Sequence, residues 1–202
     1  MIAIIDYGMG NLRSVLKAIE AVGGRAEIAN DPDQVRHADQ VILPGVGAFA
    51  DAIAELRKTG LDQAFIEAVH AGKDCLGVCL GLQLLFEESD EDGVHKGLGL
   101  LPGRVVRFKK HPGLKIPHMG WNTLQIRRSI PLLHGLESSP SVYFVHSYHA
   151  VPSNPSDIVA EADYPNPFAA IVGHDNLTAC QFHPEKSQRA GLAMYANFSK
   201  RA

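Results

Sequence analysis

Cys79 lies in a pentapeptide whose residue types and spacing suit a reactive thiol. Gly77-Val78-Cys79-Leu80-Gly81 follows an apolar run and precedes a helical pattern. A nucleophile elbow has this arrangement: a strand ends in a sharp turn that exposes the nucleophile at the start of a helix. Glycines are expected on both sides because a side chain there would collide with the strand or the helix. The partial positive charge of a helix N-terminus also favours a thiolate. A buried structural cysteine beside two loop glycines is the alternative.

A histidine and a carboxylate that could serve this thiol stand near the C-terminus, in Gln181-Phe182-His183-Pro184-Glu185. A cysteine nucleophile needs a base to form the thiolate and an acid to protonate the leaving group, and histidine does both near neutral pH. His183 and Glu185 are two residues apart, so both side chains face one side of an extended segment. His183 could then face the thiol while Glu185 holds the far ring nitrogen. A solvated turn is the alternative.

Acyl transfer also needs donors for the oxyanion, and two backbone positions could supply them. The N–H of Leu80 directly follows the nucleophile, and Pro44-Gly45-Val46-Gly47 ends another predicted strand. Glycines let such a loop turn a peptide N–H, here that of Val46, toward the site. An ordinary tight turn is the alternative. All of these segments follow predicted strands, where open α/β sheets place their sites.

The elements that must position these groups alternate between strand and helix in the first half of the chain. The apolar patterns predict strands at Ile2–Ile5, Ala26–Ala29, Val41–Leu43 and Cys75–Val78, and helices at Asn11–Val22, after Asp31-Pro32, and at Ala48–Lys58, Leu61–Ala71 and Leu80–Glu87. This rhythm indicates a parallel sheet with right-handed crossovers.

The second half is richer in strands. They are predicted at Arg104–Phe108, Trp121–Ile126, Val142–Ala150, Ile158–Ala162, Phe168–Gly173 and Leu177–Gln181, with a hairpin turn at Asp175-Asn176 and a closing helix at Gln188–Phe198. No linker or repeat divides the chain. We therefore expect a single domain over residues 1–202, of the α/β class, with three layers: an open, mixed, mainly parallel sheet and helices on both faces.

Composition excludes several classes of partner and cofactor. The net charge of −3 argues against nucleic acid, and no apolar run approaches the length of a membrane span. Three cysteines without framework spacing and no signal-peptide pattern indicate a reducing, cytoplasmic location. The ten histidines are scattered, so we expect no metal and no cofactor.

Taken together, Gly77–Gln83 and His183–Glu185 resemble the motifs of the class I, triad-type glutamine amidotransferases. Four further segments are similar to those of one branch of that family, whose members deliver ammonia to a separate cyclase chain. They are Asp6-Tyr7-Gly8-Met9-Gly10-Asn11, Pro44-Gly45-Val46-Gly47, His118-Met119-Gly120-Trp121-Asn122 and Phe144-Val145-His146-Ser147-Tyr148.

The resemblance implies a flavodoxin-like fold and a Cys-His-Glu triad that hydrolyses L-glutamine. In this family Cys79 would attack the carboxamide to give a γ-glutamyl thioester, His183 would shuttle the proton and Glu185 would orient His183. The implied substrate-binding residues are Gly47, Gln83, Ser147 and Tyr148. The implied partner is a β/α-barrel cyclase in a heterodimer, contacted by Asn11, Trp121, Tyr143 and Lys186.

Val46 suggests how the free chain could be held inactive. A β-branched residue resists the positive φ that glycine accepts, so the oxyanion loop could rest with its N–H turned away until the partner binds. Three other functions stay open on sequence alone: a glutaminase serving another synthase, a related γ-glutamyl hydrolase, and a binding module that has lost the chemistry.

Overall fold

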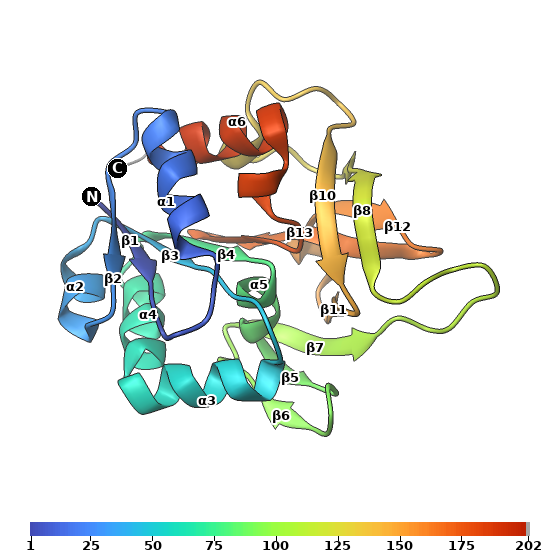
Figure 1. Ribbon diagram of the computed structural model, residues 1–202, viewed down its shortest axis with the longest axis horizontal. Helices are drawn as coiled ribbons and strands as arrows, with labels where there is room; N and C mark the ends of the chain where they lie inside the picture. Colours follow the sequence, from blue (N-terminus) through green and yellow to red (C-terminus); the bar gives the residue numbers. More distant parts are fainter. Residues whose placement is uncertain (201–202) are drawn as a thin grey trace.

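The computed structural model describes residues 1–200 and is built on one eight-stranded sheet (Figure 1). In spatial order the strands are β2 (Ala26–Ala29), β1 (Ile2–Ile5), β3 (Gln40–Leu43), β4 (Asp74–Val78), β14 (Leu177–Cys180), β13 (Pro167–His174), β12 (Ile158–Asp163) and β9 (Gln125–Ile126). The first five run parallel and the last three pair antiparallel. The predicted mixed, mainly parallel α/β sheet is confirmed.

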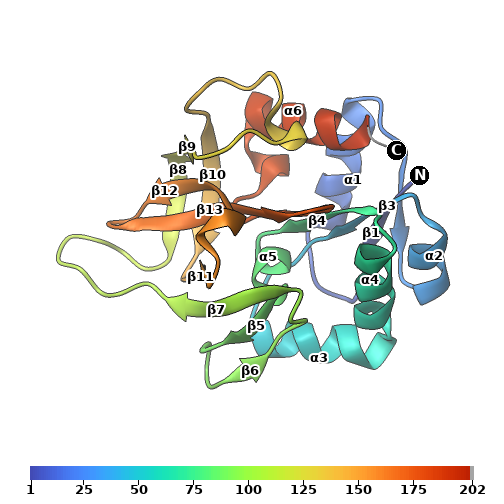
Figure 2. The same cartoon turned by 180° about the vertical axis from the view of Figure 1, so that it is seen from behind.

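Helices cover both faces of this sheet, as the views from front and back show (Figures 1 and 2). On one face lie α1 (Leu12–Ala21) and α6 (Gln188–Ser199), and on the other α3 (Phe49–Thr59) and α4 (Leu61–His70). The short α2 (Pro32–His37) begins at the predicted Asp31-Pro32, where the Asp31 side chain accepts from Asp33 N and Gln34 closes a capping box.

The apolar runs of the parallel strands follow from this three-layer arrangement. In β1, Ile2 and Ile4 pack into the cluster that includes Val15 and Ile19 of α1. Ala3 and Ile5 face the opposite cluster, which contains the buried side of α3 and α4. A strand buried on both faces reads as a continuous hydrophobic segment rather than an alternating one.

Two smaller sheets stand beside the main one. One has the order β11 (Tyr148–Pro152), β7 (Leu101–Arg107), β5 (Phe86–Ser89) and β6 (His95–Lys96), and the other pairs β10 (Ser141–His146) with β8 (His118–Thr123). Short 3-10 helices lie at Pro131–Leu133, Pro155–Asp157 and Pro184–Lys186.

Three predictions of local structure were wrong. The helix predicted over Leu80–Glu87 ends early, because α5 covers only Leu80–Leu84 and the chain then enters β5. The strand predicted over Val142–Ala150 is two strands, since β10 pairs with β8 while β11 pairs with β7, and Ser147 lies between them. The strand predicted over Trp121–Ile126 is likewise divided between β8 and β9.

Candidate active site

Cys79 occupies the sharp turn between β4 and α5. Its φ of 55° is unusual for a residue with a side chain, and its N–H donates to Cys180 O at 2.8 Å. A Cβ on Gly77 would come within 2.9 Å of the Ala179 Cβ, and one on Gly81 within 1.9 Å of Leu43 O. The predicted steric need for both glycines is therefore confirmed, and the turn has the geometry of a nucleophile elbow.

His183 and Glu185 follow β14, which is the neighbour of β4 in the sheet. His183 Nδ1 lies 2.8 Å from Glu185 Oε1, and the two side chains are 3% and 2% exposed. The other ring nitrogen remains for an interaction with Cys79, which lines the same pocket. The backbone of His183 is also fixed, since its N–H donates to Tyr143 O at 3.0 Å and its carbonyl accepts from Ser187 Oγ at 2.6 Å.

The charge state of His183 is set by its two acidic neighbours. Burial by itself would lower the pKa of the imidazole, but hydrogen bonds with Cys79 and Glu185, and the negative charges of both, raise that pKa to about 10. A charged imidazole between a thiol group and a carboxylate can stabilise a thiolate and later donate its proton to a leaving group. The three side chains thus form the arrangement that nucleophilic acyl transfer requires.

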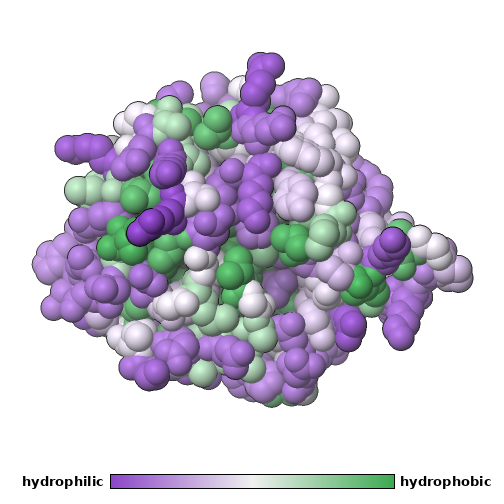
Figure 3. Space-filling model, viewed as in Figure 1, coloured by the Kyte–Doolittle hydropathy of each residue, from purple (hydrophilic) through white to green (hydrophobic). Residues whose placement is uncertain are grey.

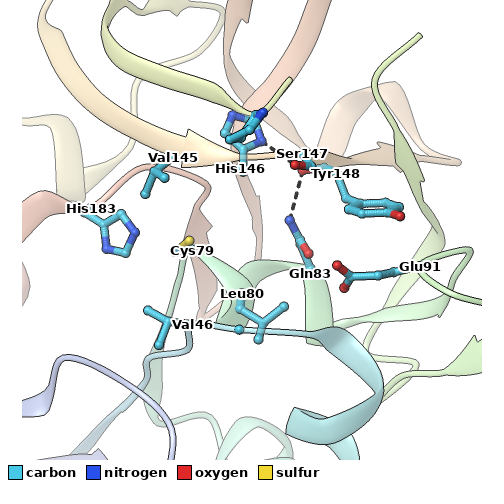
Figure 4. A pocket seen from close by; sticks show the side chains of 12 residues that line it. Val46, Cys79, Leu80, Gln83, Glu91, Val145, His146, Ser147, Tyr148 and His183 are labelled. Carbon is cyan, nitrogen blue, oxygen red and sulfur yellow. Dashed lines mark hydrogen bonds between the residues drawn. The ribbon is translucent and has the colours of Figure 1, made fainter. Parts of the chain in front are cut away.

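One pocket gathers the predicted reactive and substrate-binding residues (Figure 4). Its lining includes Val46, Gly47, Cys79, Leu80, Gln83, Ser147, Tyr148 and His183. Glu185 is not part of the lining but lies behind His183. In Figure 4, His183, Cys79 and Val46 stand at one end of the pocket, and Gln83, Tyr148 and Glu91 stand at the other.

The far end of the pocket presents acceptor oxygens. Gln83 Nε2 donates to Tyr148 O at 3.0 Å and to Gln181 Oε1 at 3.1 Å, so both of its amide hydrogens are engaged. The remaining Gln83 Oε1 points toward the Glu91 carboxylate side of the pocket (Figure 4). Such a pair of oxygens suits an ammonium group.

Sequence reasoning missed Glu91, Pro117, Val145 and the pocket position of His146. Glu91 is held by a hydrogen bond from Phe49 N to its Oε2 at 2.8 Å. Burial raises the pKa of Glu91, and the hydrogen bond from Phe49 N partly offsets this rise. The acidic run from 87 to 92 was the available signal. The helix predicted over Leu80–Glu87 did not place this run at the pocket.

The oxyanion donors are not in place in this conformation. The Leu80 N–H, expected to be free, donates to Gly45 O at 3.3 Å. Tyr7 Oη donates to Pro44 O at 3.0 Å, and a Cβ on Gly45 would come within 2.6 Å of that hydroxyl oxygen. The Gly45 carbonyl oxygen therefore accepts the Leu80 N–H, which cannot at the same time donate to an oxyanion. The oxyanion hole is not formed in this conformation.

Three of the four residues expected to contact a partner have exposed or partly exposed side chains on or beside the β8–β10 ribbon. Trp121 is 49% exposed and lies edge-on to the half-buried Tyr143 with ring centroids 6.0 Å apart, and Lys186 is exposed next to the triad. Asn11 is exposed at the start of α1. Val46 and Met119 are exposed as well, and Figure 3 shows hydrophobic residues in a broken band across the middle of this face.

The remaining cysteines do not line this pocket. Cys75 and Cys180 are buried and free, as expected for small core residues. Burial raises the pKa of Cys75 to about 12 and that of Cys180 well above its usual range. Within residues 1–200 there is no helix long and apolar enough to cross a membrane. The same described part of the chain contains no group of three His, Cys, Asp or Glu side chains able to hold a metal ion.

Comparison with known proteins points to one family. A family model described as glutamine amidotransferase class-I matches residues 3–202. Imidazole glycerol phosphate synthase subunit HisH of Syntrophotalea carbinolica is 53% identical, with 98% of each chain covered. The subunit of the same name from Desulfitobacterium hafniense is 52% identical, covering 99% of this chain and 94% of that protein. PurLQS from Thermotoga maritima has a similar fold, with a TM-score of 0.77 at 19% identity over 97% of this chain and 95% of that one.

Proposed function

The chain belongs to the class I glutamine amidotransferases, and from this premise we propose that it is the glutaminase subunit of imidazole glycerol phosphate synthase. The observation that carries the proposal is that His183 lies beside Cys79 and is held by Glu185 at the carboxyl edge of the sheet. The two HisH relatives, which match nearly the whole chain, support the choice of pathway, histidine biosynthesis. We propose that residues 1–202 act as one glutamine amidotransferase domain.

In the proposed reaction the Cys79 thiolate attacks the carboxamide carbon of glutamine. His183 gives its proton to the departing nitrogen, so ammonia leaves and a γ-glutamyl thioester remains on Cys79. His183 then takes a proton from water, which attacks the thioester and releases glutamate and the thiol. Glu185 orients the ring and stabilises its charged form throughout.

We propose that glutamine binds in this pocket in one orientation. Its carboxamide would lie between Cys79 and His183, and its α-ammonium group would reach the Gln83 oxygen and Glu91. Ser147, Tyr148 and Gly47 line the walls between these two ends. A carboxylate is the partner that most strengthens binding of an ammonium group in a partly buried pocket.

The ammonia would pass to a cyclase subunit, a β/α barrel in a heterodimer with this chain. The cyclase would use it to make imidazole glycerol phosphate and AICAR. The exposed apolar side chains Met119 and Trp121 on β8 support a docking surface there, together with the nearby Tyr143 and Lys186. Asn11 would contribute from the start of α1.

A single peptide rotation would complete the oxyanion hole. Turning the Gly45–Val46 peptide would remove the Gly45 oxygen from Leu80 N–H and bring the Val46 N–H into the pocket. Partner binding at the exposed Val46 could favour this change. Because one oxyanion donor is worth about 10²–10³ in rate, the free chain would hydrolyse glutamine slowly.

Replacing Val46 tests this gating. Val46→Gly removes the β-branched barrier to peptide rotation, so glutamine hydrolysis by the free chain should rise about 10-fold or more. The rate of the complex with the cyclase should change much less. A free wild-type chain that already works at the full rate of the complex would contradict the gating.

The proposed function itself is tested by Cys79→Ala in the complex with the cyclase. Synthesis fed by glutamine should fall by at least about 10³-fold, while synthesis fed by ammonium salts should be retained. Cys75→Ala is the matched control, because it removes a buried thiol outside the pocket. Loss of both activities in Cys79→Ala would indicate a structural role, and a wild-type complex that uses no glutamine would refute the function.

A further inference from the structure

A chain of hydrogen bonds outside the triad runs from β8 to the pocket. Asn122 Nδ2 lies 3.3 Å from His118 Nε2, and His118 Nδ1 lies 3.0 Å from His146 Nε2. His146 Nδ1 in turn lies 2.8 Å from the carbonyl oxygen of Tyr148. The two imidazoles therefore link the exposed ribbon to the backbone at the recognition end of the pocket.

The groups at the two ends of this series of hydrogen bonds, the Asn122 amide and the Tyr148 carbonyl, decide which atom donates and which accepts in each bond. Asn122 Oδ1 accepts from Thr123 N at 2.8 Å, and Asn122 Nδ2 donates to Asp163 O at 2.9 Å, so the amide presents a hydrogen to His118. His118 Nε2 must then accept and its Nδ1 must donate. The Tyr148 carbonyl can only accept, so His146 donates from Nδ1 and accepts at Nε2. One neutral tautomer of each ring satisfies all three bonds.

The surroundings of the two rings keep them neutral and fixed. His118 stacks on Tyr164 and Phe144 with ring centroids 4.0 and 4.9 Å away. His146 packs against Phe108 and Phe168 at 5.1 and 5.2 Å. Burial lowers the pKa of His118 to about 4, and burial, partly opposed by the bond to the Tyr148 carbonyl, lowers that of His146 to about 3. Neutral rings in such packing hold geometry rather than transfer protons.

The series of hydrogen bonds continues from Tyr148 to Gln83, which is one of the proposed substrate-binding residues. The Tyr148 oxygen accepts from both His146 and Gln83, which uses both of its lone pairs. Rotating the Gln83 amide by half a turn would set its oxygen against the Tyr148 oxygen, two acceptors face to face. The position of that carbonyl therefore decides that Gln83 turns its oxygen, not its nitrogen, toward Glu91 (Figure 4).

We propose that His118 and His146 are positioning residues that fix the Tyr148 carbonyl and, through it, orient Gln83 to recognise the α-ammonium group of the substrate. The inference rests on the proposed glutaminase function. It assigns a role in specificity to a part of the molecule that neither contacts the reacting atoms nor titrates near neutral pH.

Two isosteres of His146 separate its two bonds. The amide nitrogen of Asn falls near the Nδ1 position, so His146→Asn retains a donor for the Tyr148 carbonyl. The oxygen of Gln reaches the Nε2 position, so His146→Gln retains an acceptor for His118 but loses the bond to Tyr148. His149→Asn is the control, because His149 stacks on Phe108 but lies outside the chain.

The readout is the preference for glutamine over its analogue without the α-amino group, measured as KM and kcat of the complex with the cyclase. In His146→Gln that preference should fall about 5–10-fold, mainly through KM for glutamine, as expected for a lost or misdirected hydrogen bond. His146→Asn should keep most of the preference, and His149→Asn should match the wild type.

Equal preference in wild type, His146→Asn and His146→Gln would overturn the inference, as would equal losses in both isosteres. If the His146 variants do not accumulate as folded protein, His118→Phe provides the test at the next link, since its ring can still stack on Phe144 and Tyr164. It should lower the preference, and an unchanged preference would overturn the inference. A wild-type complex without glutaminase activity would instead refute the proposed function.

Discussion

Two buried histidines that line the pocket differ in charge. His183 lies against the Cys79 thiol and the Glu185 carboxylate, and its pKa is raised to about 10. His146 lies between another imidazole and a backbone carbonyl, and its pKa is lowered to about 3. Burial lowers the pKa of both rings, and only in His183 do acidic partners reverse that effect. The charged ring is suited to proton transfer, and the neutral ring is suited to holding a fixed hydrogen-bond geometry.

The largest effect should come from removing the charged ring. His183→Gln leaves Cys79 without its base and acid, and glutamine hydrolysis should fall about 10²–10⁴-fold. Assays of ammonia release and of ammonium-fed synthesis in the complex measure this, and the ammonium-fed rate should be retained. A loss no greater than that of His146→Asn would erase the distinction between the two sites.

Removing the charge of Glu185 while keeping the shape of its side chain should lower the rate of glutamine hydrolysis less than removing His183 does. Glu185→Gln keeps an acceptor oxygen for Nδ1–H, yet the imidazolium loses its carboxylate, so the pKa of His183 should move down toward its usual value. The rate should fall roughly 10²-fold, at the lower end of the loss expected for His183→Gln. Because protonated His183 is the acid that releases ammonia, the alkaline limb of the kcat/KM profile should also shift to lower pH. An unshifted limb would show that Glu185 does not set the charge of His183.

The smallest expected effect is on the free energy of unfolding. Its pH dependence reports on His146, the neutral histidine. The pKa of His146 is about 3 in the folded chain and about 6.5 when unfolded, so the unfolded state binds more protons between these values. Its contribution to stability is full above pH 6.5 and is lost as the pH falls toward 3. Between pH 7 and pH 5 the wild type should lose about 2 kcal/mol through this group.

His146→Asn carries no such group, so its free energy of unfolding should fall less over the same interval. Denaturant titrations at pH 7 and pH 5 give the difference, and His111→Asn, at an exposed site, is the control for general effects of substitution. The raised pKa of His183 acts in the opposite direction in all three chains and cancels in the comparison. Identical pH dependence in the wild type and His146→Asn would mean that His146 is not held neutral.

The residues of the proposed triad could be singled out from the sequence because their signals are local. The elbow is encoded by an apolar strand and two glycines whose absence of side chains is sterically required. His183 and Glu185 follow a strand that pairs beside β4, and the alternation of strands and helices is enough to place such ends at one edge.

What could not be predicted depends on long-range pairing. Residues 80–86 are apolar except for Gln83 and suit a helix, but β5 begins at Phe86 and pairs with β7. The break at Ser147 exists because β10 and β11 pair with different strands. The role of His146 was hidden for the same reason, since its partner His118 lies on β8 and nothing in either local sequence shows their contact.

The most direct test of the account is to label the thiols with a glutamine analogue that carries an electrophilic chloroketone in place of the carboxamide. The complex with the cyclase is treated at neutral pH, and peptide mass spectrometry then locates the adduct. We predict one adduct, on Cys79, that is suppressed by excess glutamine and formed much more slowly in His183→Gln. Labelling of Cys75 or Cys180 at a similar rate, or of Cys79 at an unchanged rate in His183→Gln, would contradict it.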